Sequence, residues 1–242
     1  MMKLVTPFRV LVILTAAVAA LLQLSAPVGY RMGWWHFRTG LTGLQPWAVY
    51  VGLAAGALAI IALAIPKVRA GWTVGLVAAL AVGLAVAYVP WQWRERAQSV
   101  PRIHDISTDT VNPPLFIAVL PLRAGVENTA AYGGKEIADQ QLKGYPDIKP
   151  LELGVPPQAA FSRAKDVVEA MGWTMVASDP ASGRIEATDT TFWYGFKDDV
   201  VIRVTPAGAG SKVDVRSVSR VGRSDIGVNA KRIREYLAKL KG

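Results

Sequence analysis

Three long apolar stretches in the first 90 residues constrain this fold more than any other feature of the sequence. They cover residues 10–28, 47–65 and 71–89, each 19 residues long and without a charged side chain. A helix needs roughly 20 apolar residues to cross the hydrocarbon core of a bilayer. Because lipid offers backbone groups no hydrogen-bond partner, a stretch that crosses it must be helical. The sequence therefore predicts a transmembrane anchor of three α-helices over residues 1–90.

The first apolar stretch has a second interpretation, as a cleaved signal peptide. Lys3 and Arg9 supply the basic start of such a peptide, and the small residues Ser25 and Ala26 supply its end. Two further stretches of the same length follow, and this favours an uncleaved first helix.

The charged residues between the spans predict the orientation of the anchor. Lys67 and Arg69 lie in the shortest connection, and short basic loops stay in the cytoplasm. With three spans, the N-terminus shares that side and the residues after the third span lie on the other. Arg31 and Arg38 on the opposite side make the charge difference small. We therefore expect a multi-pass inner-membrane protein with its soluble part on the periplasmic side.

Small residues are spaced four apart within the apolar stretches, and this spacing lets helix backbones approach closely. The pairs are Gly52 with Gly56, Gly71 with Gly75, and Ala79 with Gly83. We expect them to form contacts within the three-helix bundle, ahead of contacts between two copies. The sequence leaves the oligomeric state open.

The charge distribution argues against nucleic-acid binding. No acidic residue precedes Glu95, and six of the 27 basic residues lie in the first 90 positions. The remainder carries 21 basic and 18 acidic residues, a net charge of +3 rather than the +9 of the whole chain. A nucleic-acid-binding domain needs a concentrated basic face. The chain also has no cysteine, so disulfides and thiolate chemistry are excluded.

The second part of the chain predicts one soluble α+β domain. Residues 91–114 have the composition of a linker, and the domain is expected over residues 115–242. Residues 116–120 form a short apolar run that could dock as a strand, and residues 123–144 predict irregular chain with one helical turn. One-sided apolar periodicity predicts a helix from Pro157 to Met171.

Four alternating segments follow that helix, at residues 173–178, 185–190, 200–204 and 213–218. A last helix begins near Val228. The order predicts a four-strand antiparallel meander whose apolar face is covered by two flanking helices.

Several blocks of this domain closely resemble the bacterial family called domain of unknown function 1499. The blocks are residues 104–114 (HDISTDTVNPP), 145–151 (YPDIKPL), 185–188 (IEAT), 192–199 (FWYGFKDD), 214–223 (DVRSVSRVGR) and 224–232 (SDIGVNAKR). The resemblance covers about residues 103–240. It implies a fold and a membrane setting but no activity. Some relatives carry cysteines near residues 106–112, where this chain has none, so a disulfide or metal role does not transfer.

Two adjacent carboxylates, Asp198 and Asp199, are the most enzyme-like feature of the sequence. Such a pair can bind a hard cation or divide acid and base roles. Neighbouring residues on a strand point to opposite faces, however, so the two side chains are not expected to converge. We therefore favour a structural interpretation, with a carboxylate capping the turn before the strand.

A second group of charged residues shares the polar face of the predicted sheet: Glu186, Arg203, Asp214 and Arg216. One interpretation is a solvated lattice of cross-strand ion pairs. The other is an anion site in which Arg203, Arg216 and Arg220 donate bidentate hydrogen bonds, with Arg223 extending the basic rim. On this second interpretation we expect Arg216 to hold the anion.

Two further clusters favour structural roles. Ser224 or Asp225 is expected to cap the last helix. His104 lies beside Asp105 and Asp109, but a chain with two histidines makes zinc improbable, and no metal or cofactor is predicted.

Together these features predict a membrane-anchored envelope protein whose α+β domain is a binding or scaffolding module. Its expected partners are the lipid bilayer and an envelope protein or small anionic ligand. The alternative is a hydrolase-type enzyme that uses Asp198 and Asp199 with Arg203 and Arg216.

Overall fold

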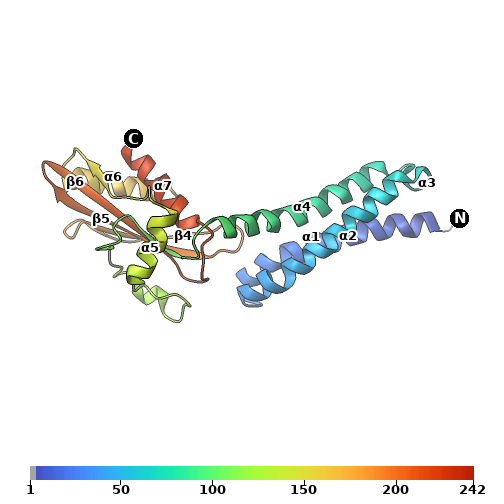
Figure 1. The fold of residues 1–242 in the computed structure, drawn as a ribbon, viewed down its shortest axis with the longest axis horizontal. Helices are drawn as coiled ribbons and strands as arrows, with labels where there is room; N and C mark the ends of the chain where they lie inside the picture. The colour runs from blue at the N-terminus through green and yellow to red at the C-terminus, as the bar shows by residue number, and fades with distance from the viewer. Residues whose placement is uncertain (1–3) are drawn as a thin grey trace. The chain divides into compact units, whose positions relative to one another are not determined.

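The computed structural model describes residues 4–242, which form two compact units. One unit comprises the chain up to Glu95 together with Trp193–Gly195, and the other comprises Arg96–Phe192 and Phe196–Gly242. Figure 1 labels the α-helices of both units and, in the second unit, strands β4, β5 and β6. We describe each unit by itself.

The first unit is helical, as its apolar stretches predict. Its elements are α1 (Val5–Arg31), a π-helical segment (Thr39–Leu44), α2 (Gln45–Ala64), the short α3 (Pro66–Arg69) and α4 (Thr73–Ser99). Three helical segments are long and apolar enough to cross a membrane, with a mean hydropathy of 2.1 or 2.2. The helices extend beyond the apolar stretches because flanking residues such as Arg94 and Arg96 are themselves good helix formers.

The predicted small-residue contacts lie inside this unit. A Cβ atom added at Gly83 of α4 would lie 2.6 Å from the carbonyl oxygen of Gly52 and 2.9 Å from the backbone nitrogen of Gly56, both on α2. No side chain fits in that space, so glycine is required where α2 and α4 cross. This confirms contacts within the bundle for these three glycines.

Arg9 ties the first helix to the connection between α2 and α4. Its Nε donates to the carbonyl of Val68 at 2.7 Å, and its Nη2 donates to the carbonyls of Lys67 and Ala70 at 2.9 and 2.8 Å. The guanidinium also lies 5.6 Å from the centre of the Trp72 ring. The basic connection and the start of α1 therefore lie at the same end of the bundle.

The second unit is built on an antiparallel sheet of six strands rather than the predicted four. The strands are β1 (Asp105–Ser107), β2 (Leu151–Leu153), β3 (Thr174–Asp179), β4 (Arg184–Thr190), β5 (Lys197–Ala207) and β6 (Gly210–Ser219). β3 to β6 form the predicted meander, and their order in the sheet is β1-β6-β5-β4-β3.

The two additional strands, β1 and β2, pair with different halves of β6. Each has three residues, too few to show an alternating pattern, so the sequence analysis placed β1 in a linker. The chain from 91 to 114 is thus partly helix α4 and partly strand.

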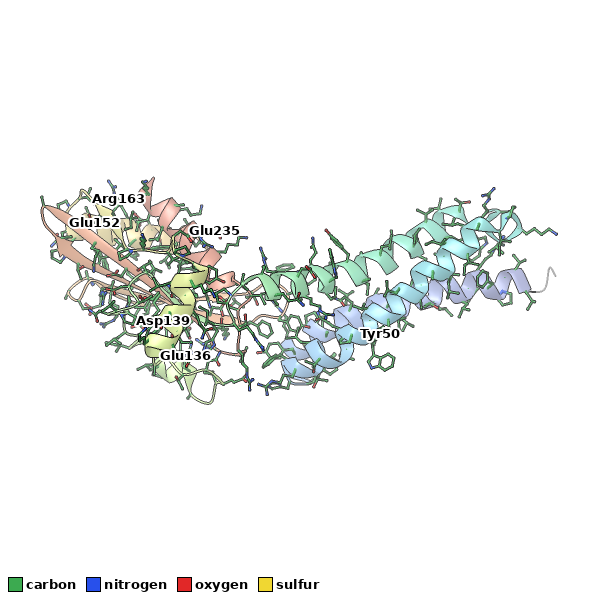
Figure 2. All side chains as sticks on the ribbon, in the orientation of Figure 1. Tyr50, Glu136, Asp139, Glu152, Arg163 and Glu235 are labelled. Atoms are coloured by element: carbon green, nitrogen blue, oxygen red, sulfur yellow. The ribbon has the colours of Figure 1, made fainter. Side chains whose placement is uncertain are left out.

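Two helices cover the apolar face of the sheet, as predicted: α6 (Pro157–Ala170) and α7 (Val228–Lys241). Tyr236 of α7 stacks on Trp173 at 5.4 Å and donates its hydroxyl to the carbonyl of Ala164 in α6 at 2.9 Å. The outer sides of both helices carry exposed charged residues such as Arg163 and Glu235 (Figure 2). This layer buries the main core.

The opposite face of the sheet is covered by residues 109–130, which we call the strap. It contains one short 3-10 helix (Leu120–Arg123) and otherwise has no regular structure. Phe116 and Val119 of the strap pack against Val201 of β5 and Val218 of β6. The predicted strand at residues 116–120 does not form. This segment covers the face of the sheet, and three of its backbone N–H groups donate to the side chain of Glu186 rather than to a neighbouring strand. Residues 123–144 also hold more helix than expected, α5 (Gly134–Gly144).

Candidate functional site

Glu186 of β4 fixes the middle of the strap. Its carboxylate accepts three backbone N–H groups, from Ile117 at 2.9 Å, Ala118 at 3.0 Å and Val119 at 2.9 Å. The side chain is fully buried. The solvated face that the sequence predicted for Glu186 is therefore wrong: alternation identifies the residues that share a face but not the segment that covers it.

Arg216 of β6 is also fully buried, and this corrects its predicted place on an open surface. Its Nε and Nη2 bind the two oxygens of Asp105 at 2.9 and 2.7 Å. Its remaining donors reach the carbonyls of Pro114 and Ala130 in the strap at 3.2 and 2.8 Å. These partners occupy four of the five N–H groups of a fully buried guanidinium, so Arg216 is not accessible to a diffusing anion.

Two aromatic rings enclose the same guanidinium. The ring centres of Phe116 and Tyr132 lie 5.1 and 5.3 Å from Arg216. Burial, reinforced by the charge of Asp105, raises the pKa of Tyr132 to about 12. Arg216 is thus a structural anchor that binds β1, β6 and both ends of the strap.

Asp199 of β5 forms a third anchor on this face. Its carboxylate accepts from Arg220 at 2.9 and 2.8 Å, from Thr188 at 2.7 Å and from Arg123 of the strap at 2.6 Å. Burial alone raises the pKa of Asp199, but the hydrogen bonds from Arg220, Thr188 and Arg123 outweigh it, so the pKa is lowered from its ordinary value. A carboxylate that holds its charge this firmly is a poor general base.

Asp198 points to the other face of the sheet, towards α7. Arg232 of that helix binds Asp198 at 2.7 Å and Asp189 at 2.8 Å. Asn229 and Ser217 complete the cluster through hydrogen bonds to Arg232 and to each other. Asp198 and Asp199 therefore belong to two separate ion-pair clusters, and the structure does not bring them into one site.

Gly227 occupies the N-cap position of α7, so the predicted N-cap at Ser224 or Asp225 is wrong, although both side chains bind backbone N–H groups just before or within the first turn. Ser224 accepts the N–H of Ile226 at 3.2 Å, and Asp225 accepts those of Gly227 and Asn229 at 2.9 and 2.6 Å. Burial raises the pKa of Asp225 above its ordinary value. Of these N–H groups, that of Asn229 belongs to the first turn of α7, where backbone amides lack a partner within the helix.

Arg203 of β5 lies at the edge of the strap and remains partly exposed, at 21% of its side chain. Its Nε and Nη2 bind Asp214 at 3.2 and 2.8 Å, and Nη2 also reaches Asp109 at 3.2 Å and the carbonyl of Asn112 at 2.9 Å. Asp105 and Asp109, predicted neighbours of His104, thus each pair with an arginine. Within residues 4–242, no cluster of three or more His, Cys, Asp or Glu suits a metal ion.

Arg184 of β4 stands directly opposite Arg203 in the register of the two strands. Like charges in this position repel each other. Arg184 is 26% exposed, and its Nε lies 3.2 Å from Glu186 while its Nη2 lies 3.7 Å from Asp179. Across the described residues, neither Nη atom of Arg184 donates a hydrogen bond, and Nη1 of Arg203 donates none either.

Both arginines line a groove of about 210 Å³ between the strap and the sheet. The other lining residues are Asn112, Pro114, Leu115, Ile117, Ser182 and Val201. The groove therefore combines two guanidiniums that retain donors with a mainly apolar wall. Of the predicted binding residues, it contains Arg203 alone; Arg216 and Arg220 are buried elsewhere, and Arg223 is exposed outside the groove.

The sequence pattern did not identify Arg184, Arg123 or Arg232 as site residues. Arg184 could have been found by counting back from the loop between β4 and β5, since the register then places it opposite Arg203. Arg123 lies in a segment without periodicity. Arg232 lies on the last helix, where apolar residues alone were used to predict the side that faces the sheet.

One comparison with known proteins identifies a family. The family described as "Protein of unknown function (DUF1499)" matches residues 105–240, more than half of the chain. No curated protein matches the chain. The matched region runs from β1 into the last turn of α7, so it includes the sheet, the strap, the three buried anchors and the groove. The chain belongs to the DUF1499 family of proteins of unknown function.

Proposed function

We propose that this chain is a membrane-anchored envelope protein whose α+β domain is a binding module. The groove between the strap and the sheet takes the anionic group of its ligand. Arg184 and Arg203 bind that group, and the apolar wall contacts the rest of the molecule.

The pair of facing arginines is the observation that carries this proposal. Two guanidiniums directly opposite each other repel, and an anion between them relieves the repulsion. Both side chains are partly exposed and retain N–H donors, so binding requires no rearrangement of a buried group. Arginine also matches the planar geometry of carboxylate and phosphate groups.

The other charged groups support a binding role over catalysis. Asp199, Glu186 and Arg216 each form at least one hydrogen bond to the strap, and their other hydrogen bonds are to neighbouring protein groups. None of the three lines the groove; they hold in place the strap that forms one of its walls. A rigid, fully satisfied support of this kind is what a preorganised binding site needs.

Three apolar helices support the membrane anchor. The basic residues Lys67 and Arg69 lie in the shortest connection, at the same bundle end as Arg9. This favours a cytoplasmic N-terminus and an envelope domain outside the cytoplasm. A C-terminal alkaline phosphatase fusion should be active and a C-terminal green fluorescent fusion dark; the reverse pattern contradicts this orientation.

Binding is tested with the full-length protein in nanodiscs of phosphatidylcholine. Calorimetric titration with inorganic phosphate and with butyrate should detect binding of at least one of the two anions. Arg184→Gln removes a charge-assisted contact worth about 1.5–3 kcal/mol and should weaken that binding tenfold or more. Arg223→Gln, an exposed arginine outside the groove, is the matched control and should bind as the wild type does. No binding to the wild type, or equal binding to both variants, contradicts the proposal.

A further inference from the structure

We infer that the ligand of this groove is an amphiphile: an anionic head carried on an unbranched aliphatic chain. The inference rests on the proposed function and names the class of molecule that the groove fits. It is carried by the exposed apolar side chains of the wall, Leu115 and Ile117, an observation independent of the two arginines.

The strap presents large apolar side chains to solvent beside the guanidiniums. Leu115 is 71% exposed and Ile117 is 52% exposed, and both line the groove together with Pro114 and the buried Val201. Exposed apolar side chains that adjoin each other beside a groove mark a binding surface more often than an isolated exposed leucine does. Here they extend the apolar wall outward from the charged end.

This wall is held rigidly in its exposed position. The carbonyl of Pro114 accepts from the buried Arg216 at 3.2 Å, and the N–H of Ile117 donates to the buried Glu186 at 2.9 Å. Leu115 lies between these two fixed points. The segment therefore cannot turn its leucine inward without breaking a contact to a buried charge, which is costly.

The charged end of the groove suits a single small head. Asp179, the nearest exposed carboxylate, already accepts hydrogen bonds from Ser182 at 2.5 Å and from the N–H of Ala181 at 3.1 Å, in the turn between β3 and β4. It lies 3.7 Å from Arg184, beyond hydrogen-bond distance. A carboxylate or phosphate oxygen can therefore reach the Nη atoms of Arg184 without displacing a formed hydrogen bond.

The volume of the groove limits how much of the ligand it can enclose. Sites that enclose a drug-sized ligand measure about 300–1,000 Å³, whereas this groove measures about 210 Å³. It has room for the head and the first methylenes, and the rest of the chain lies over Leu115 and Ile117. A fatty acid and a single-chain phosphate ester share this chemistry.

The test measures binding as a function of chain length. Full-length protein in phosphatidylcholine nanodiscs is dialysed to equilibrium against butyrate, hexanoate and octanoate, and in parallel against butyl phosphate, octyl phosphate and inorganic phosphate. The amount of ligand retained by nanodiscs that carry Arg184→Gln is subtracted, which corrects for ligand that partitions into the bilayer. We expect the remaining affinity to rise about fourfold for each methylene that contacts the wall.

Leu115→Gln supplies the second arm. Because Leu115 is exposed, its substitution leaves folding intact, and the rise with chain length should become shallower while binding of the shortest anion is retained. The stronger of the carboxylate and phosphate series then identifies the head. Binding of short anions with no dependence on chain length overturns the inference and leaves the proposed function standing. If no anion of either series binds, the proposed function itself fails.

Discussion

The two faces of the sheet are stabilised in different ways. One face is apolar and packs against α6 and α7 through side chains such as Ile202 and Ile233. The other face carries Glu186, Asp199 and Arg216, and an irregular strap covers it by binding these charges. Helices satisfy their own backbone groups, so an apolar contact suffices for them, whereas an irregular segment needs polar partners for its buried N–H and C=O groups.

A segment without secondary structure is thus fixed on a sheet by contacts to buried charges. Glu186 and Arg216 bind strap backbone groups directly, and Asp199 binds Arg123, whose guanidinium donates to the carbonyl of Asn128. The two faces should therefore respond differently to mutation: the charged face to loss of a partner, and the apolar face to loss of volume.

The largest effect is expected at Arg216. Arg216→Ala leaves Asp105 buried without its partner, which typically costs about 3–5 kcal/mol. Urea unfolding of the full-length protein in nanodiscs should show this loss for the soluble domain, and Arg223→Ala should change stability by less than about 0.5 kcal/mol. A small effect at Arg216 contradicts its role as an anchor.

A smaller effect is expected at Glu186, where the change keeps the shape of the side chain. Glu186→Gln replaces the carboxylate that accepts three strap N–H groups with a neutral amide. A hydrogen bond to a charged group contributes about 1.5–3 kcal/mol to stability. Amide hydrogen exchange at Ile117–Val119 should speed up more than exchange in α6. If both regions exchange as in the wild type, the strap does not depend on this carboxylate.

The apolar face should tolerate a conservative change better than the charged face does. Ile202→Val removes one buried methylene opposite α6 and α7, and such changes cost about 0.5–1.5 kcal/mol. Its unfolding free energy should fall by that amount, with strap exchange unaltered relative to the rest of the domain. A loss as large as that of Arg216→Ala would remove the proposed contrast between the faces.

Acid should weaken the charged face in a predictable direction. The pKa of Asp199 is lowered by folding, so its contribution is complete above the ordinary aspartate pKa of about 3.9 and is lost as pH falls through the folded value. Folding raises the pKa of Asp225, so the ionisation of Asp225 changes the free energy of unfolding in the opposite direction. Stability measured in steps below about pH 4 should fall less steeply in Asp199→Asn than in the wild type; equal slopes contradict the assignment.

Sequence patterns predicted the elements that rely on periodicity. The alternation in β4 to β6 and the apolar stripe of α6 each reflect one face buried against one layer. The strap has no period, since its position depends on contacts with residues about 70 to 110 positions away, such as Ile117 with Glu186 and Pro114 with Arg216. Candidate arginines were therefore recognisable by type, but only the fold separates the buried Arg216 from the groove-lining Arg203.

The pairing of β1 with the end of β6 has a consequence for how the chain is made. Asp105 and Arg216 are 111 positions apart, so the strap emerges from the ribosome long before the strand that secures it. Until β6 is complete, Asp105 and the strap amides lack their native partners, and loop closure over this distance is slow. A chain that stops before β6 would thus expose Phe116 and Val119, which are buried in the folded domain, on an unsecured segment, the kind of surface that chaperones and proteases recognise.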